Sequence, residues 1–323
     1  MPAQPAGAAR RPEFIQVSRP DATAQRDELA SGLLQDRPVI APKFFYDTLG
    51  SKLFEAITVL DEYTSTRAEA AVLEAHLDAI AHACGEGHTL VDLGAGNCAK
   101  AARLFGRLKP RAYVAVDISA DFLQQALRDL QARHPDVPML GLGMDLERLP
   151  ALPPQVGQGA RLMFYPGSSI GNFTPEAAVD FLRRVREAAP GGALLIGVDL
   201  LKPAPLLQRA YDDALGVTAA FNLNVLRHVN RLLGSDFDPA QWRHLARFDA
   251  ASARVEMHLQ ARSDLRVQWP GGSRAFRQGD RLLTEIACKY SVEGFDTLLR
   301  RAGYGQTHAW TDPLRSFAIF VAR

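Results

Sequence analysis

The sequence predicts an α/β fold in which a mostly parallel sheet carries helices on both faces, with an α+β region inserted into the chain. Short apolar runs alternate with helical stretches from residue 64 to residue 200, which is typical of βαβ units. After residue 200 a long helical stretch is followed by runs of alternating apolar and polar residues, as in antiparallel strands. From residue 288 a helix and two apolar runs return the chain to the first sheet.

The first part of the sheet can be followed element by element. Apolar residues recur at helical spacing in "TRAEAAVLEAHLDAIAHA" (66–83). A strand, a glycine loop and a helix follow in "TLVDLGAGNCAKAARLFGRL" (89–108). The same order repeats in "AYVAVDIS" with "ADFLQQALRDLQARH", continues through the strand "MLGLGMDL", and repeats in "ARLMFYPGSS" with "PEAAVDFLRRVREAA". The strand "GGALLIGVDLL" completes this part.

The inserted region has its own pattern. It contains a helical stretch (204–233) and the strand runs "ARVEMHLQARSDLRVQW" and "RAFRQGDRLLTEIACKYS". The helix "VEGFDTLLRRAG" and two strands around Asp312-Pro313 then close the first sheet. We therefore expect a flexible tail (1–13), an inserted domain (14–63 and 201–287) and a sheet domain (64–200 and 288–323).

Composition limits the classes of function. The 323 residues are 47% hydrophobic and 23% charged, with a formal net charge of +1. This balance gives no electrostatic footprint for nucleic acid or an anionic membrane, so a small-molecule ligand is expected. The three cysteines show no paired spacing, which favours a reducing compartment, the cytoplasm. The histidines show no metal-binding spacing, so we predict no metal, and we expect a monomer.

The loop "VDLGAGNCAK" is the first candidate binding site. Gly94 and Gly96 stand between a strand end and a helix N-terminus, where a missing side chain lets a ligand approach the backbone. With Ala99 they satisfy the dinucleotide pattern, and Asp117 lies about 20 residues on, where a ribose-binding acid is expected. Both NAD and S-adenosylmethionine fit this pattern.

Three details favour S-adenosylmethionine. Asp92 lies at the strand end before the loop, where it would attract a methionine ammonium and repel a pyrophosphate. Asp145 ends the third strand, in position to accept a hydrogen bond from the adenine amine. The chain also closes with two consecutive strands, which suits a methyltransferase sheet better than a second mononucleotide-binding half.

The loop "FYPGSSIGNF" (164–173) also joins a strand to a helix. Glycines and an amide are what such a turn and helix cap need in any protein, so the loop alone does not indicate a site. Several stretches together are more specific. "PKFFYDTLGSKLFEAIT", "DEYTSTRAEA", "VDLGAGNCAK", "PGSSIGNFTPEAA", "LIGVDLLK", "VEMHL", "TEIACKY" and "WTDPLRSFAIFVAR" resemble, in order, the histidine Nα-methyltransferases of ergothioneine biosynthesis.

That resemblance implies a Rossmann-like class I methyltransferase sheet with an inserted α+β substrate-binding domain. It also implies three transfers from S-adenosylmethionine to the α-amine of L-histidine, which give hercynine. The residues implied to bind the cofactor are Asp92, Gly94, Gly96, Lys100, Asp117 and Asp145. Those implied around the reacting amine are Tyr46, Tyr63 and Gly167.

The resemblance also implies how the rest of histidine is bound. Asn172 and Tyr211 would hold the carboxylate, and Glu285 would accept a hydrogen bond from the imidazole beside Met257 and Thr218. An amide and a phenol are suitable neutral donors for a carboxylate. The two glycines of "PGSSIGN" would let the methyl donor and the amine approach the same backbone turn.

One position departs from the pattern. The resemblance implies Ser after "TEI", but this chain has Ala287, so one hydrogen bond to the imidazole would be missing. Such a bond is worth about 0.5–1.5 kcal/mol. Histidine is the expected substrate, and tryptophan or another aromatic amino acid is the alternative. Rival functions from other classes are an NAD-dependent oxidoreductase and a catalytically silent binding protein with the same fold.

Overall fold

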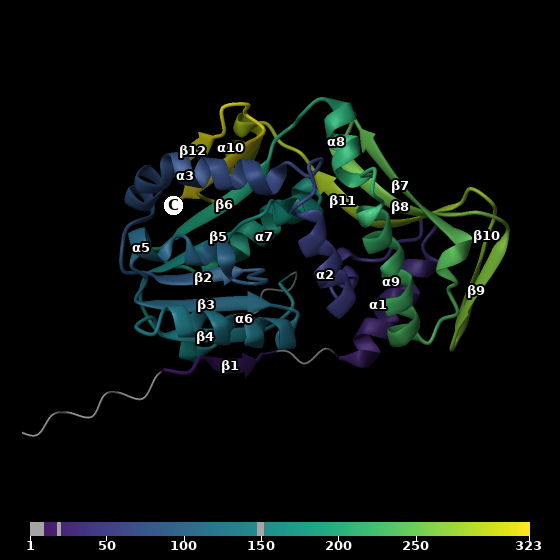
Figure 1. The fold of residues 1–323 in the computed structure, drawn as a ribbon, viewed down its shortest axis with the longest axis horizontal. Helices are drawn as coiled ribbons and strands as arrows, with labels where there is room; N and C mark the ends of the chain where they lie inside the picture. Colours follow the sequence, from purple (N-terminus) through teal and green to yellow (C-terminus); the bar gives the residue numbers. More distant parts are fainter. Residues whose placement is uncertain (1–9, 18–20, 147–151) are drawn as a thin grey trace, which may run out of the picture.

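A large sheet organises one half of the molecule (Figure 1). The structure, a computed structural model, describes residues 10–17, 21–146 and 152–323. Its sheet has the strand order β1-β4-β3-β2-β5-β6-β13-β12. The bounds are β1 Glu13–Gln16, β2 Thr89–Leu93, β3 Ala112–Asp117, β4 Met139–Gly143, β5 Arg161–Tyr165, β6 Ala193–Asp199, β12 Thr307–Thr311 and β13 Phe317–Ala322.

The pairing of these strands explains where a ligand can bind. Strands β1 to β6 pair in parallel, whereas β13 runs antiparallel to both β6 and β12. The chain moves outward from β2 to β3 and β4, and then crosses back to β5 on the other side of β2. In open α/β sheets, ligands bind beyond the carboxyl ends of the strands at such a reversal of order. The two glycine-containing loops follow β2 and β5, the strands that meet there.

Helices cover both faces of the sheet, as predicted. One buried core contains residues of the sheet, α7 (Pro175–Glu187) and α10 (Val292–Arg301). The other contains residues of the sheet, α3 (Ser65–Cys84) and α6 (Ala120–Arg133). Two short helices, α4 (Ala99–Ala102) and α5 (Phe105–Leu108), replace the single helix expected after the glycine loop. The predicted mixed α/β class is confirmed.

The N-terminal segment and the inserted segment share a further core. Its antiparallel sheet has the order β11-β8-β7, and β9 and β10 form a separate hairpin. Figure 1 shows this region beside the large sheet, with α2 on the side of the region that faces the sheet. The bounds are α1 Ala22–Leu34, η1 Pro42–Phe45, α2 Thr48–Ile57, α8 Ala204–Tyr211, α9 Val217–Leu233, β7 Trp242–Asp249, β8 Arg254–Ala261, β9 Leu265–Trp269, β10 Gly272–Phe276 and β11 Arg281–Cys288.

The predicted boundary at residue 14 needs a correction. Strand β1 pairs with β4 at the edge of the large sheet, not with the inserted region. Phe14 and Gln16 lie over Gly141 and Gly143, where a Cβ atom would meet their side chains at 2.7 Å and 2.5 Å respectively. A strand of four residues is short, and its packing depends on two glycines far away in the sequence. The residues of the strand itself therefore give little indication that it forms. Of the predicted tail, residues 1–9 lie outside the described residues.

Candidate active site

The glycine loop after β2 is fixed by the next strand. Gly94 and Gly96 have φ angles of +74° and +51°, values that L side chains rarely adopt. The Gly96 amide donates to Asp117 Oδ2 at 2.9 Å, and the Ser119 amide donates to Asp117 Oδ1 at 2.9 Å. Burial raises the pKa of Asp117, although these backbone donors oppose the shift. The loop therefore presents an ordered carboxylate beside an open stretch of backbone.

Asp117 lines a cleft of about 250 Å³, which we call the inner cleft. Its walls also include Gly94, Gly96, Asp145 and Asn172. Asp145 forms an ion pair with Lys43 at 3.1 Å, and Lys43 pairs with Glu28 at 2.9 Å. The predicted adenine-binding acid thus lies in the cleft, linked to a cation from η1.

A second cleft of about 450 Å³ adjoins the first and also includes Gly94 and Gly96. Asp92 lines it and is only 1% exposed. The Tyr113 hydroxyl donates to Asp92 Oδ2 at 2.7 Å, whereas Oδ1 has no hydrogen-bond partner in the described residues. Burial raises the pKa of Asp92 to about 7. A buried acceptor without a partner, next to an open glycine loop, fits the ammonium of an S-adenosylmethionine molecule.

Lys100 lies in this second cleft but is held by another side chain. Its ammonium forms an ion pair with Glu69, which is 2% exposed on α3. The other Glu69 oxygen accepts a hydrogen bond from the Gly167 amide at 2.7 Å. Glu69 therefore connects the two loops at the centre of the site. Glu69 was not among the predicted site residues, although it lies in the matching stretch "DEYTSTRAEA".

The loop after β5 joins the two regions. Gly167 has a φ of +77°, and a Cβ atom on it would lie 3.1 Å from Lys100 Nζ. Gly171 packs so closely on β11 that a Cβ would lie 2.9 Å from the Cys288 carbonyl oxygen. Both glycines of "PGSSIGN" are therefore required by packing or by conformation. The loop leaves Gly167 at the second cleft and Asn172 at the inner cleft.

Five aromatic rings lie together beside these loops. The centroid distances are 5.7 Å for Tyr46–Phe54, 6.0 Å for Tyr46–Phe221, 6.5 Å for Phe54–Tyr63 and 6.4 Å for Tyr63–Tyr211. Burial raises the pKa of the Tyr46, Tyr63 and Tyr211 phenols well above the ordinary value, and the Glu285 carboxylate adds to each shift. These phenols are therefore neutral at physiological pH.

Glu285 is the acid whose charge acts on three of these rings, Tyr46, Tyr63 and Tyr211. It lies on β11 opposite Met257 of β8, next to a bulge in the pairing of the two strands. Its carboxylate has no hydrogen-bond or ion-pair partner within the described part of the chain. Burial raises its pKa to about 7, although the Lys289 ammonium opposes the shift. Thr218 is buried on α9, one turn before Phe221.

Residues 25–323 match the sequence profile described as "Histidine-specific methyltransferase, SAM-dependent". The chain belongs to this family. It is 39% identical over 308 residues to the histidine Nα-methyltransferase of Mycolicibacterium smegmatis. This match covers 93% of this chain and 95% of the relative. It is also 39% identical over 306 residues to the enzyme of that name from Mycobacterium tuberculosis, covering 93% and 94% of the two chains.

A longer relative matches with part of its length. Ergothioneine biosynthesis protein 1 of Neurospora crassa is 30% identical over 276 residues, or 82% of this chain and 31% of the relative. The predicted family is confirmed. The cofactor of this family is S-adenosylmethionine, so this methyltransferase uses S-adenosylmethionine rather than NAD.

Ala287 of the methyltransferase lies two residues after Glu285 on β11 and is 4% exposed. It packs in a small apolar cluster with Leu207 and Val255, against Tyr211 and Phe248. Its methyl group offers no hydrogen-bond donor in place of the hydroxyl of the expected serine.

Glu285 also predicts how stability depends on pH. A carboxyl whose pKa is raised on folding binds its proton more tightly in the folded state, so stability falls as pH rises from about 4.5 to about 7. We expect Glu285→Gln to raise the Tm of the ligand-free methyltransferase at pH 8 by about 2–5 °C. The difference should vanish near pH 4.5. Thermal unfolding at both pH values tests this, and a lower Tm at pH 8 would contradict it.

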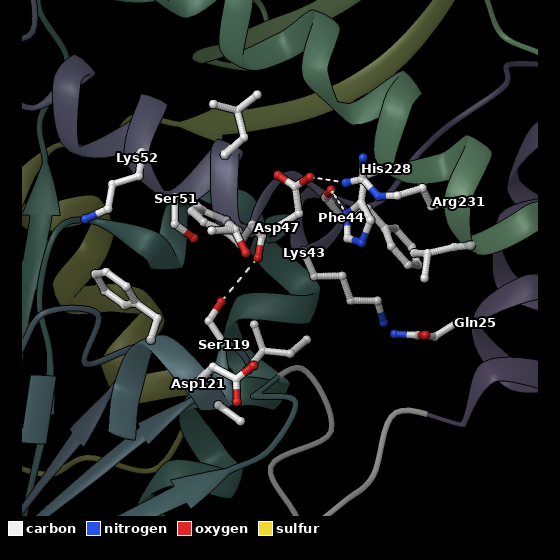
Figure 2. Close-up of a pocket in the computed structure, with 17 residues that line it drawn as sticks. Gln25, Lys43, Phe44, Asp47, Ser51, Lys52, Ser119, Asp121, His228 and Arg231 are labelled. Atoms are coloured by element: carbon white, nitrogen blue, oxygen red, sulfur yellow. Dashed lines mark hydrogen bonds and ion pairs between the residues drawn. The ribbon is translucent and has the colours of Figure 1, made fainter. Parts of the chain in front are cut away.

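An outer cleft of about 930 Å³ leads toward the inner cleft, and both are lined by Lys43, Tyr46 and Ser119. Figure 2 shows the ion pair between Arg231 and Asp47 at this cleft. Ser119 Oγ donates to the Tyr46 carbonyl oxygen at 3.2 Å (Figure 2), which connects the large sheet to the inserted region. The inner cleft of the methyltransferase therefore adjoins the boundary between its two regions.

The part of the methyltransferase that the structure describes contains no group of three or more His, Cys, Asp or Glu side chains arranged to hold a metal ion. No helix in it has the length and apolar character that crossing a membrane requires.

Proposed function

We propose that this protein transfers three methyl groups from S-adenosylmethionine to the α-amine of L-histidine, forming hercynine for ergothioneine biosynthesis. The observation that carries the proposal is Glu285, a partly buried acid without a protein partner in the described residues, whose charge acts on three tyrosines. An imidazole N–H supplies the donor that this carboxylate lacks. The 39% identity to two histidine Nα-methyltransferases supports the same substrate.

The cofactor is assigned to the two clefts that meet at the glycine loop. Asp92 would pair with its ammonium, Gly94 and Gly96 would lie against its backbone, Asp117 would accept from the ribose, and Asp145 would accept from the adenine. Lys100 would approach the cofactor carboxylate while paired with Glu69. When bound there, S-adenosylmethionine supplies an electrophilic methyl group.

The amino acid is assigned to the space between the loop after β5 and the aromatic group. Asn172 and Tyr211 would donate to its carboxylate. Its amine would lie near Gly167, Tyr46 and Tyr63, with the imidazole directed to Glu285, Met257 and Thr218. This arrangement mainly provides alignment, and holding two reactants in line is the largest contribution a protein makes to such a displacement.

The tyrosines, as neutral phenols, would orient the amine and stabilise its positive charge. Each transfer converts the amine to an ammonium, which must lose a proton before the next transfer. The Tyr46 and Tyr63 phenol oxygens can accept an N–H hydrogen bond and so orient the nitrogen lone pair. The faces of Tyr46, Tyr63 and Phe221 would stabilise the final trimethylammonium cation by about 0.5–2 kcal/mol.

Product analysis tests this function directly. The purified protein would be incubated with S-adenosylmethionine and equal amounts of all twenty amino acids, and the products identified by mass spectrometry. We expect trimethylated histidine as the main product. Methylation of a different amino acid would keep the reaction and reject the substrate, whereas no methylation would support the silent binding protein.

Tryptophan is the second candidate substrate because Ala287 lies in an apolar cluster. An indole has one N–H and would lose less from a missing serine hydroxyl. A 4-dimethylallyltryptophan N-methyltransferase of Arthroderma benhamiae is also 25% identical to this chain over 304 residues, covering 88% of each. Supplying histidine and tryptophan together to one enzyme preparation, and measuring which of them is methylated, distinguishes the two substrates.

Ala287→Ser should strengthen histidine binding by restoring a donor to the imidazole. We expect KM for histidine to fall about 3–10-fold, the equivalent of one neutral hydrogen bond, with little change in kcat. Ala261→Ser is the matched control, since Ala261 is buried on β8 and pairs with Trp242 at the other end of the sheet. An unchanged or higher KM in Ala287→Ser would show that the hydroxyl does not reach the substrate.

We further infer that the protein acts as a monomer in the cytoplasm. The unpaired cysteine spacing supports the compartment. Light scattering of the purified protein tests the oligomeric state.

A further inference from the structure

A buried lysine approaches Tyr211 from the end of β11. Lys289 is 5% exposed, and its Nζ donates to the Tyr211 hydroxyl oxygen at 2.8 Å. The same Nζ lies 4.9 Å from the centroid of the Tyr211 ring and 2.8 Å from Asp199 Oδ2. None of these three contacts was part of the predicted site.

The direction of the hydrogen bond between Lys289 and Tyr211 follows from chemistry. An ammonium group has three donors and no acceptor, so the Tyr211 oxygen must accept. The Tyr211 O–H then remains available to donate, and its phenol has no other hydrogen bond in the described residues. Lys289 therefore leaves the Tyr211 phenol with one O–H that it can donate.

Asp199 keeps Lys289 in place. Asp199 is 2% exposed at the end of β6 and also pairs with Lys202. The Ser65 hydroxyl donates to Asp199 Oδ1 at 2.9 Å. Burial alone would raise the pKa of Asp199, but the Lys289 and Lys202 ammonium groups outweigh it and lower the pKa. Two cations share the Asp199 carboxylate, and Lys289 is the one that contacts Tyr211.

The backbone of Tyr211 is fixed as well. His244 Nε2 lies 2.8 Å from the Tyr211 carbonyl oxygen, and Asn222 Nδ2 lies 2.8 Å from His244 Nδ1. Because the Asn222 amide nitrogen donates, His244 Nδ1 accepts and Nε2 carries the proton that it donates to Tyr211. Tyr211 is thus held at its backbone and at its phenol, at the C-terminal end of α8.

We propose that Lys289 is a positioning residue that directs the Tyr211 phenol proton toward the carboxylate of the amino-acid substrate. The proposal rests on the function proposed above. Lys289 occupies the phenol's acceptor site, and its positive charge favours an anion beside the phenol. Lys289 acts through Tyr211 and does not take part in the methyl transfer itself.

Lys202 provides a matched control for a test of Lys289. Both ammonium groups pair with Asp199, but Lys289 is the one that donates to Tyr211. Lys289→Met leaves Asp199 paired with Lys202 and Ser65, and Lys202→Met leaves it paired with Lys289. Each variant therefore removes one buried charge from the same cluster and leaves a neutral ion pair.

Steady-state kinetics with histidine at saturating S-adenosylmethionine would compare these variants. We expect Lys289→Met to raise KM about tenfold with a smaller change in kcat. Lys202→Met should change KM less than about twofold. In a Tyr211→Phe background, Lys289→Met should have little further effect on KM. Phenylalanine has no hydroxyl for Lys289 to contact, so the two substitutions remove the same interaction.

Equal KM values for the two lysine variants would overturn the proposal, as would an undiminished Lys289→Met effect in Tyr211→Phe. If Lys289→Met does not fold, Lys289→Gln keeps a donor to the phenol without the charge. Its KM should lie between those of wild type and Tyr211→Phe, and a KM at or above that of Tyr211→Phe would also overturn the proposal. If the wild-type protein methylates another amino acid, the same comparison applies, since every amino acid carries the carboxylate.

Discussion

Replacing Glu285 with alanine is expected to lower kcat/KM for histidine about 100-fold. The wild-type carboxylate is partly buried near Tyr46, Tyr63 and Tyr211, whose pKa values it raises, and it has no protein donor in the described residues. Its hydrogen bond to an imidazole N–H would involve a charged acceptor, and such bonds contribute about 1.5–3 kcal/mol. Steady-state kinetics with histidine, in parallel with amino acids lacking a side-chain N–H, measures the loss.

Two further variants make the Glu285 test specific. Glu285→Gln retains an acceptor oxygen and similar volume, so we expect an intermediate loss of about tenfold. Glu256→Ala removes an acid from the adjoining strand β8, where Glu256 pairs with Arg254 and His258, and should leave histidine turnover close to wild type. If Glu285→Ala behaved like Glu256→Ala, the imidazole would be bound elsewhere.

The architecture of the sheet could be predicted because its signals are local. Each buried strand is a short apolar run followed by a turn, and the amphipathic helices between them repeat at regular spacing. The final antiparallel hairpin, β12 and β13, was also visible in the order of the last elements. Strand β1 was missed because its pairing with β4 depends on two glycines more than 120 residues away, Gly141 and Gly143.

The loop proposed to bind the cofactor has a local signal for a similar reason. Gly94, Gly96 and Asp92 lie within five residues of one another, so the strand, the turn and the acid form one local pattern. The partners of these loops were not predictable. Glu69 reaches Gly167 across 98 residues of sequence, and it occurs in a helix whose pattern indicates only packing.

The charged cluster near Tyr211 shows the same limit. Lys289 and Asp199 are 90 positions apart, and although they lie in the matching stretches "TEIACKY" and "LIGVDLLK", no local pattern indicates that they meet. Their contact arises because β6 and the residues after β11 meet at the isolated bridge between Leu200 and Tyr290. The sequence therefore predicts Tyr211 as a neutral donor but gives no sign of Lys289, the cation that contacts it. Side chains that act through others are the part of a site that local patterns reveal least.

Replacing Asp92 with asparagine is expected to weaken binding of S-adenosylhomocysteine, which carries the same ammonium as the cofactor, by about 10–100-fold. The variant keeps the size of the side chain and removes the charge opposite that ammonium. Because burial raises the pKa of Asp92 to about 7, the wild-type carboxylate ionises between about pH 6 and 8. Wild-type binding should therefore tighten over this interval, and binding to Asp92→Asn should not.

Isothermal titration with S-adenosylhomocysteine at pH 6, 7 and 8 measures both effects. Tyr113→Phe removes the hydrogen bond to Asp92 Oδ2 and leaves the charge in place. Because that bond lowers the pKa of Asp92, its loss should move the rise in affinity to higher pH without abolishing it. Charges on Asp117, Lys100 and Glu69 also act on Asp92, but all three remain in both variants. Equal affinity of wild type and Asp92→Asn at pH 8 would show that the cofactor ammonium is bound by another group.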